Sequence, residues 1–154
     1  MRKKIALFAA TAAVISGLAV WATMGSAGAI GTRQTFTVIE KDTQDHFVDH
    51  PPLHRPNPGD YFTFSGVLRQ SGNNAGIVDG TCTFTHSKPL RFFCLATFTL
   101  KNQGQIEVQT SFSNAKHFNA GVNGGTGDFQ NARGFVQIDQ LTRNTSRDIF
   151  HLVP

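Results

Sequence analysis

The alternation of apolar and polar residues in short segments is the feature that most restricts the fold of this chain. The segments begin near residue 34, continue to the C-terminus and are dominated by Thr, Val, Ile and Phe. All but one of the 14 Phe residues lie beyond residue 29, so this region can form a substantial core. It contains no stretch with the apolar spacing of an amphipathic helix over three turns, and the pattern predicts β-strands.

Turn-forming residues divide this region into eight expected strands. The strands cover residues 34–40, 60–70, 76–86, 90–101, 105–113, 117–122, 134–142 and 147–153. A loop at 42–59 holds four of the six prolines, and a Gly-rich connection covers 123–131. Short strands joined by hairpin-length turns favour an all-β, closed antiparallel barrel, because closure leaves no unpaired edge. A β-sandwich is the alternative.

The first 29 residues have the features of a secretory signal peptide. Arg2, Lys3 and Lys4 precede a long uncharged stretch, and the residues at 27–29 form the small-x-small site that signal peptidase cuts. An uncleaved membrane anchor is the alternative, but the Ala, Gly, Ser and Thr content makes this stretch weakly hydrophobic. We therefore expect a signal peptide at 1–29 and a single secreted, extracytoplasmic domain at 30–154, with its barrel at about 34–153. Contact with a membrane is expected only through the signal segment.

The charge distribution argues against a nucleic-acid partner. The chain carries 14 Lys and Arg against 10 Asp and Glu, a formal net charge of +4. Arg2, Lys3 and Lys4 account for most of this excess, so the mature domain is close to neutral. It contains no basic run and no basic–aromatic stripe of the kind that nucleic-acid-binding domains present.

The two cysteines are placed symmetrically about a turn. Cys82 and Cys94 each lie six residues from Lys88, so a hairpin centred there places them opposite each other on one face. Because an exported protein meets oxidising conditions, we expect a Cys82–Cys94 disulfide. Two small buried core residues are the alternative.

The segment NGGTGDFQNARG at 123–134 resembles the GGTG-containing signature of dirigent proteins and the related allene oxide cyclase barrels. Three weaker matches follow the family order: GDYFTFSGVL at 59–68, GTC at 80–82 and GQIEVQ at 104–109. The resemblance covers nearly the whole mature domain. It implies an eight-stranded calycin-like β-barrel with a hydrophobic cavity at one mouth, and a homo-oligomer (dimer or trimer), since the plant relatives are often trimeric.

The glycines of this segment are expected to be structural. Gly124, Gly125 and Gly127 permit a tight chain reversal, and Gly134 permits a close backbone approach as the next strand starts. Phe129 is then free to enter the core. A phosphate-binding loop is the alternative, but it requires a following helix N-terminus, whereas a strand is expected here.

The known cyclase chemistry does not transfer to this chain. Plant allene oxide cyclases use a Glu and an Asn on the first strand and an Asn on the second. Aligning the EKD segment at 40–42 with the family's ERD places Thr37 and Ile39 at the first two positions, and Gly66 falls at the third. Cys82 does match the cyclase cysteine. The resemblance therefore does not predict allene oxide cyclase activity.

Two functions are consistent with such a barrel. The first is that of a cofactor-free cyclase, isomerase or dirigent-like guide, which binds a small hydrophobic molecule and directs its cyclisation, isomerisation or stereoselective coupling. The candidate catalytic residues are Glu107, Asp79, Tyr61 and Arg69. The candidate ligand-binding residues are Phe62, Phe64, Cys82 and Phe84. The alternative for the four polar residues is a solvated position on the outer face.

The second function is that of a non-catalytic extracellular ligand-binding or structural barrel protein, favoured by the few catalytic-type residues and by export. Two or more titratable groups that converge in a pocket would favour an enzyme. A wholly apolar or filled barrel would favour binding or structure.

Three histidines recur at a metal-ligand spacing. His46, His50 and His54 are four residues apart, as zinc ligands on one helix face would be. Pro51 and Pro52 interrupt any such helix, so we interpret the segment as a proline-rich loop and expect no metal.

Overall fold

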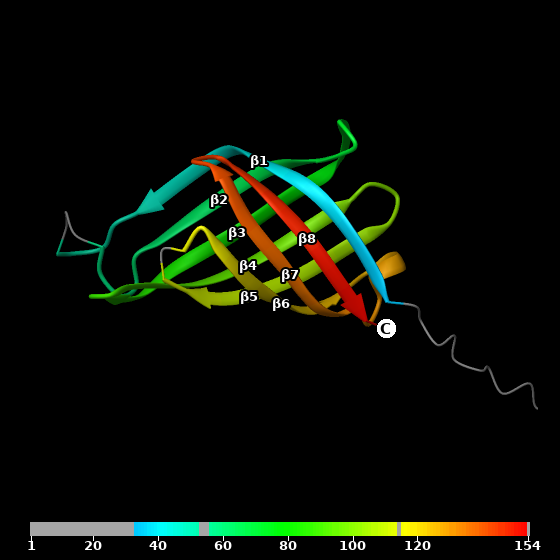
Figure 1. The fold of residues 1–154 in the computed structure, drawn as a ribbon. Coiled ribbons are helices and arrows are strands. Elements are labelled where there is room, and N and C mark those ends of the chain that lie inside the picture. Colours follow the sequence, from blue (N-terminus) through cyan, green and yellow to red (C-terminus); the bar gives the residue numbers. More distant parts are fainter. Residues whose placement is uncertain (1–32, 53–55, 114, 154) are drawn as a thin grey trace, which may run out of the picture.

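The computed structural model describes residues 33–52, 56–113 and 115–153. The expected signal peptide and His54 lie outside these residues. The described chain forms eight strands that close into a single antiparallel barrel in sequence order (Figure 1). The strands are β1 (Gln34–Val48), β2 (Tyr61–Gln70), β3 (Asn73–Ser87), β4 (Leu90–Leu100), β5 (Gly104–Phe112), β6 (His117–Gly125), β7 (Arg133–Thr142) and β8 (Thr145–Val153). The expected all-β barrel is confirmed.

Closure depends on the pairing of the first strand with the last. β1 pairs with β8 from Gln34 opposite Leu152 to Lys41 opposite Thr145. Figure 1 shows the two strands side by side, with the C-terminus beside the start of β1. Every strand then has a neighbour on both sides, so no edge is left for pairing with another chain. Nowhere in the described residues is there a helix long and apolar enough to cross a membrane.

The first strand extends well past its expected end. The sequence predicted a strand at 34–40 and a loop from 42, but β1 continues to Val48, which pairs with Tyr61. Pairing with β2 holds the extra residues in place, so long-range hydrogen bonding overrides their weak strand pattern. The ladder contains one irregularity, at Thr43, where an extra residue lies between the pairs formed by Asp42 and Gln44.

One end of the barrel is filled. Phe36 stacks on Phe150 with ring centroids 4.8 Å apart, and Phe98 meets Phe150 edge-on at 5.0 Å. Phe129, from the 3-10 turn η1 (Gly127–Phe129), packs against Phe36 at 6.1 Å and is almost fully buried. Aromatic packing of this kind is a large part of the hydrophobic stabilisation of a small domain.

The Gly-rich segment forms the connection at this filled end. Gly127 has φ 62°, and a Cβ there would collide with the carbonyl oxygen of Gln103. Gly134 has φ 124°, and a Cβ there would collide with the carbonyl oxygen of His151. Glycine is required at both positions, because an added side chain would be strained by the backbone and blocked by its neighbour. A strand, β7, follows the connection.

Candidate functional site

A cavity of about 360 Å³ opens at the other end of the barrel. All eight strands contribute to its wall. Its volume lies in the range of sites that hold small molecules. The lining residues that the following paragraphs use are Glu40, Asp42, Asp45, Phe62, Phe64, Cys82, Phe92, Cys94, Phe112, Phe118, Arg143 and Ser146.

Phe side chains form a large part of the wall. Phe62 meets Phe92 edge-on at 6.1 Å, Phe92 stacks on Phe112 at 5.3 Å, and Phe112 stacks on Phe118 at 4.1 Å. The four rings form a continuous apolar surface from β2 across β4 and β5 to β6. Such a surface suits a flat hydrophobic ligand.

The sequence-predicted ligand-binding residues are close to this surface. Phe62, Phe64 and Cys82 line the cavity. Phe84 is buried behind it, with its ring 4.6 Å from that of Phe92. Three of the four candidates therefore line the cavity, and the fourth supports its wall.

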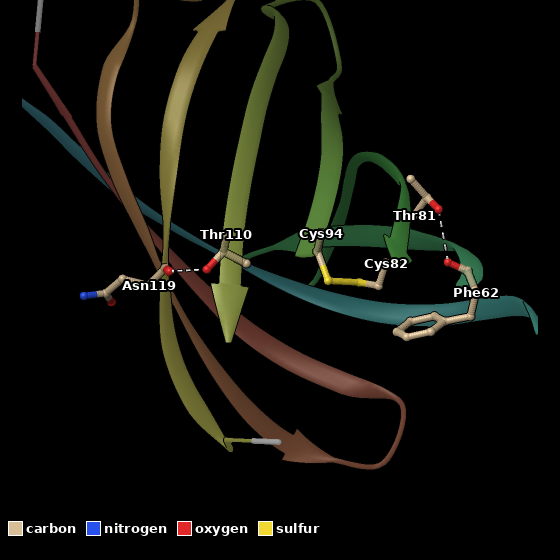
Figure 2. Close-up of a disulfide and its surroundings, with 6 residues drawn as sticks. All are labelled: Phe62, Thr81, Cys82, Cys94, Thr110 and Asn119. Carbon is tan, nitrogen blue, oxygen red and sulfur yellow. Dashed lines mark hydrogen bonds between the residues drawn. A yellow bond between two sulfur atoms is a disulfide. The ribbon is translucent and has the colours of Figure 1, made fainter. Parts of the chain in front are cut away.

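The expected disulfide is confirmed. Cys82 and Cys94 are paired directly opposite each other on β3 and β4, with Cα atoms 4.0 Å apart, and their sulfurs are bonded. Figure 2 shows the bond crossing between the two strands next to Phe62. Both cysteines line the cavity, so the crosslink forms part of its wall.

The opposite part of the wall is acidic. Glu40, Asp42 and Asp45 of β1 line the cavity, and Ser146 of β8 lies opposite Glu40 in the strand register. In a regular strand Gln44 would share the face of Asp42. The extra residue at Thr43 changes this, so that Asp45, opposite Phe64, takes the inward position.

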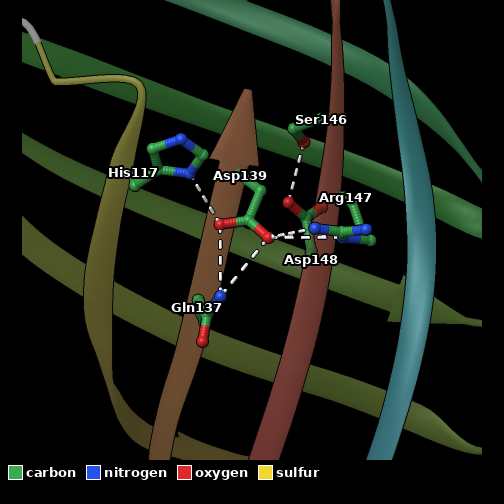
Figure 3. Close-up of polar contacts among 6 residues, drawn as sticks. All are labelled: His117, Gln137, Asp139, Ser146, Arg147 and Asp148. Carbon is green, nitrogen blue, oxygen red and sulfur yellow. Dashed lines mark hydrogen bonds and ion pairs between the residues drawn. The ribbon is translucent and has the colours of Figure 1, made fainter. Parts of the chain in front are cut away.

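Asp148 lies next to this acidic wall, in the barrel interior. Its side chain is fully buried, and Oδ1 accepts a hydrogen bond of 2.7 Å from Ser146 Oγ (Figure 3). No hydrogen-bond donor among the described residues reaches Oδ2. The carboxyl of Glu40, which is 9% exposed, lies within hydrogen-bonding reach of Asp148 and Asp42.

The acidic wall holds protons that ordinary carboxyls would lose. Burial, with the negative charge of Asp148 next in importance, raises the pKa of Glu40 to about 10. Burial also raises the pKa of Asp148 to about 6 and raises the pKa of Asp42. The ion pairs found in the described residues involve Asp60 and Asp139, so none brings a cation to these three groups.

The four sequence-predicted catalytic residues do not reach the cavity. Glu107, Asp79 and Arg69 are exposed, and Tyr61 is partly buried beside His50, with ring centroids 6.0 Å apart. The side chains of Asp79 and Arg69 bond locally, to Ser65 Oγ at 2.6 Å and to the Gly72 carbonyl at 3.3 Å. The strand register explains their positions, because these residues alternate with buried or cavity-lining neighbours and so face outward.

The acidic residues that do face inward were not singled out from the sequence. Glu40 is in phase with Phe36 and Val38 on β1, and Asp148 is in phase with Phe150 on β8. The sequence contained one signal for such residues, which is a carboxylate at a position that the alternation of apolar and polar residues assigns to the core. It would have identified Glu40 and Asp148, whereas Asp45 depends on the irregularity in β1.

A second polar cluster lies on the outer face. Asp139 of β7 accepts hydrogen bonds from Arg147 at 2.7 Å and 3.2 Å, and it pairs with His117 at 2.9 Å (Figure 3). These bonds, with those from Gln137, hold the pKa of Asp139 well below its usual range. The cluster joins β6, β7 and β8. In the described part of the chain, no three His, Cys, Asp or Glu residues are placed to hold a metal ion.

Comparison with known proteins identifies the fold. No protein-family model and no curated protein matches the chain. A pyocyanin demethylase structure is 24% identical, with a TM-score of 0.67, and the match covers 77% of this chain and 99% of that one. AbnU, an exo-specific intermolecular Diels-Alderase, is 13% identical with a TM-score of 0.64, over 79% of this chain and 98% of that one. The pterocarpan synthase dirigent protein GePTS1 is 15% identical with a TM-score of 0.65, over 80% of this chain and 86% of that one. The fold is therefore the barrel that dirigent and cyclase-like proteins share, as the sequence resemblance implied.

Proposed function

We propose that this protein is a secreted, cofactor-free barrel enzyme that binds a small hydrophobic molecule and guides its cyclisation, isomerisation or stereoselective coupling. One observation carries the proposal: two buried carboxyls, Glu40 and Asp148, lie together beside a cavity that Phe side chains line on the other side. Convergent titratable groups in a pocket are the feature that favours an enzyme over a structural barrel.

The two parts of the wall have separate tasks in this proposal. The Phe surface holds the substrate in the folded shape that the product requires, so that the reacting atoms are already close. Glu40 keeps its proton at neutral pH in the empty cavity, and a carboxyl with so high a pKa can exchange a proton with a bound substrate, while the neighbouring Asp148 accepts the hydrogen bond of Ser146. Cyclisation and isomerisation conserve the atoms of the substrate, so the proton returns to the pair. In a coupling reaction, the cavity would orient radicals that another enzyme generates.

The structural neighbours and the disulfide support the proposal. A Diels-Alderase and a dirigent protein named as a pterocarpan synthase both use this barrel for small-molecule chemistry. The Cys82–Cys94 bond is in keeping with a protein that matures in an oxidising compartment, as the expected signal peptide requires.

The test compares the metabolites of the wild-type host with those of three strains: one lacking the gene, one carrying Glu40→Gln and one carrying Glu107→Gln. Glu107 is the matched control, because it is an exposed acid on the outer face. We expect the deletion and Glu40→Gln strains to lose one product, or its stereochemical bias, and to accumulate a precursor. The Glu107→Gln strain should match the wild type. Identical profiles in the wild-type and deletion strains would contradict the proposal.

The alternative function, a non-catalytic extracellular ligand-binding barrel, is favoured by the extent of the Phe surface. It predicts a ligand that stays bound through purification from the host, detected by native mass spectrometry, and an unchanged metabolite profile in the Glu40→Gln strain.

A further inference from the structure

The charges around the cavity are unbalanced. Three acidic side chains line it, those of Glu40, Asp42 and Asp45, and Asp148 lies within hydrogen-bonding reach of Glu40. Arg143, which is exposed in the turn between β7 and β8, is the only Lys or Arg among the lining residues. A ligand with a negative charge would have to approach this wall against its repulsion.

The aromatic part of the wall also favours a positively charged ligand. The faces of Phe rings carry the negative part of the ring quadrupole, so they attract cations, and more strongly where water is excluded. Phe62, Phe92 and Phe112 place such rings in the cavity that the carboxyls line. A cavity of about 360 Å³ has room for a ligand of two or three fused rings.

We infer that the ligand of this cavity is a hydrophobic cation, an aromatic amine or a nitrogen heterocycle whose positive charge lies against Glu40 and Asp42 while its rings lie against the Phe surface. The inference rests on the proposed function, because it names the class of molecule that the same cavity takes. It excludes anionic lipids and aromatic carboxylates as ligands.

A consequence of this arrangement is that binding releases a proton. In the empty cavity Glu40 is protonated at neutral pH, because burial and the neighbouring carboxyls disfavour its charged form. A bound cation next to Glu40 favours the ionised carboxylate, so the proton leaves to the solvent. In the complex the ionised carboxylate of Glu40 can then accept a proton from the bound molecule. A neutral ligand of the same shape has no such effect.

The experiment measures the binding of three naphthalene probes by isothermal titration calorimetry at pH 7. The probes are 1-naphthylmethylammonium, 1-naphthalenemethanol and 1-naphthoate, which share a ring system and differ in charge. Each titration is run in phosphate and in Tris, because the difference in apparent enthalpy between two buffers counts the protons released. We expect the ammonium probe to bind at least about tenfold more tightly than the alcohol, to release up to about one proton, and the naphthoate to bind most weakly.

Two variants test the role assigned to Glu40. Glu40→Gln should abolish proton release and reduce the preference for the ammonium probe, whereas Glu107→Gln should behave like the wild type. If the alcohol or the naphthoate binds as tightly as the ammonium probe, the inference is wrong and the proposed function stands. Binding of none of the three probes contradicts both. An unchanged ammonium preference and proton release in Glu40→Gln also overturns the inference.

Discussion

At the scale of single residues, Glu40 occupies an energetically unfavourable position. Its carboxyl is buried without a cation, next to Asp148, which is also buried. Removing a carboxylate from water is expensive, and the group keeps its proton instead. Costs of this kind persist where a site needs them, which is a further reason to place function at this wall.

The first prediction is that Glu40→Gln stabilises the protein, increasingly so as the pH rises. The raised pKa, about 10, means that the folded protein keeps a proton that the unfolded chain releases above about pH 4.5. The wild type therefore loses stability as the pH rises through this range, whereas Gln does not titrate. We expect a gain of about 1–3 kcal/mol at pH 7 and almost none at pH 4, measured by urea denaturation. Glu107→Gln is the control, and an advantage that is independent of pH would contradict the prediction.

At the scale of elements, the outer cluster at Asp139 joins the last three strands. His117 of β6 and Arg147 of β8 both bond to Asp139, which lies between them on β7. The side chains of His117 and Arg147 are exposed, whereas the carboxylate of Asp139 is nearly covered. These contacts hold β6, β7 and β8 together near the turn between β7 and β8, at the end of the barrel where the cavity opens.

The second prediction concerns Asp139→Asn, which should lower the melting temperature at neutral pH. The lowered pKa of Asp139 means that its contribution to stability is fully present above the unfolded value near pH 4 and is lost as the pH falls through the folded value. The difference between wild type and variant should therefore be constant from pH 6 to 7 and shrink below pH 4 in thermal denaturation. Asp79→Asn, which neutralises an exposed carboxylate that accepts a hydrogen bond from Ser65, is the matched control. An equal loss at pH 3 and pH 7 would show that charge pairing is not the cause.

At the scale of the whole molecule, the two ends of the barrel have different roles. The end that contains η1 is packed with aromatic side chains, and the other end holds the cavity. The filled end supplies stability, which leaves the open end free to keep an unfilled space and a costly acidic wall. Figure 1 shows η1 at the end of the barrel where the C-terminus lies.

The third prediction follows from this division. Phe129→Ala removes a side chain that is 3% exposed and should cost about 3–5 kcal/mol in the free energy of unfolding. Where the variant remains folded, it should bind 1-naphthylmethylammonium with the affinity of the wild type, because Phe129 does not line the cavity. Phe93→Ala is the control, since Phe93 is 40% exposed and its loss should change stability by less than about 0.5 kcal/mol. A large drop in probe affinity in folded Phe129→Ala protein would contradict the separation of the two ends.

The strand pattern, the barrel and the disulfide could be predicted from the sequence, whereas the end of β1 could not. Alternation and turn residues are local signals, and a strand shows its period of two within a few residues. The Cys82–Cys94 pairing was equally local, because a hairpin centred on Lys88 places the two residues opposite each other. The Gly-rich motif at 123–134 pointed to the shared fold for a similar reason, since a tight connection constrains its own residues.

Only the tertiary structure decided which polar groups share the cavity. Glu40 and Asp148 lie near opposite ends of the domain and meet because the last strand pairs with the first, which no local pattern specifies. Asp45 faces inward because pairing with β2 produces the irregularity at Thr43. Glu107 and Asp79 were chosen for their residue type, but the strand register turns both outward. Side-chain chemistry can be read from the sequence, whereas the convergence of side chains depends on closure of the barrel and on the register of its strands.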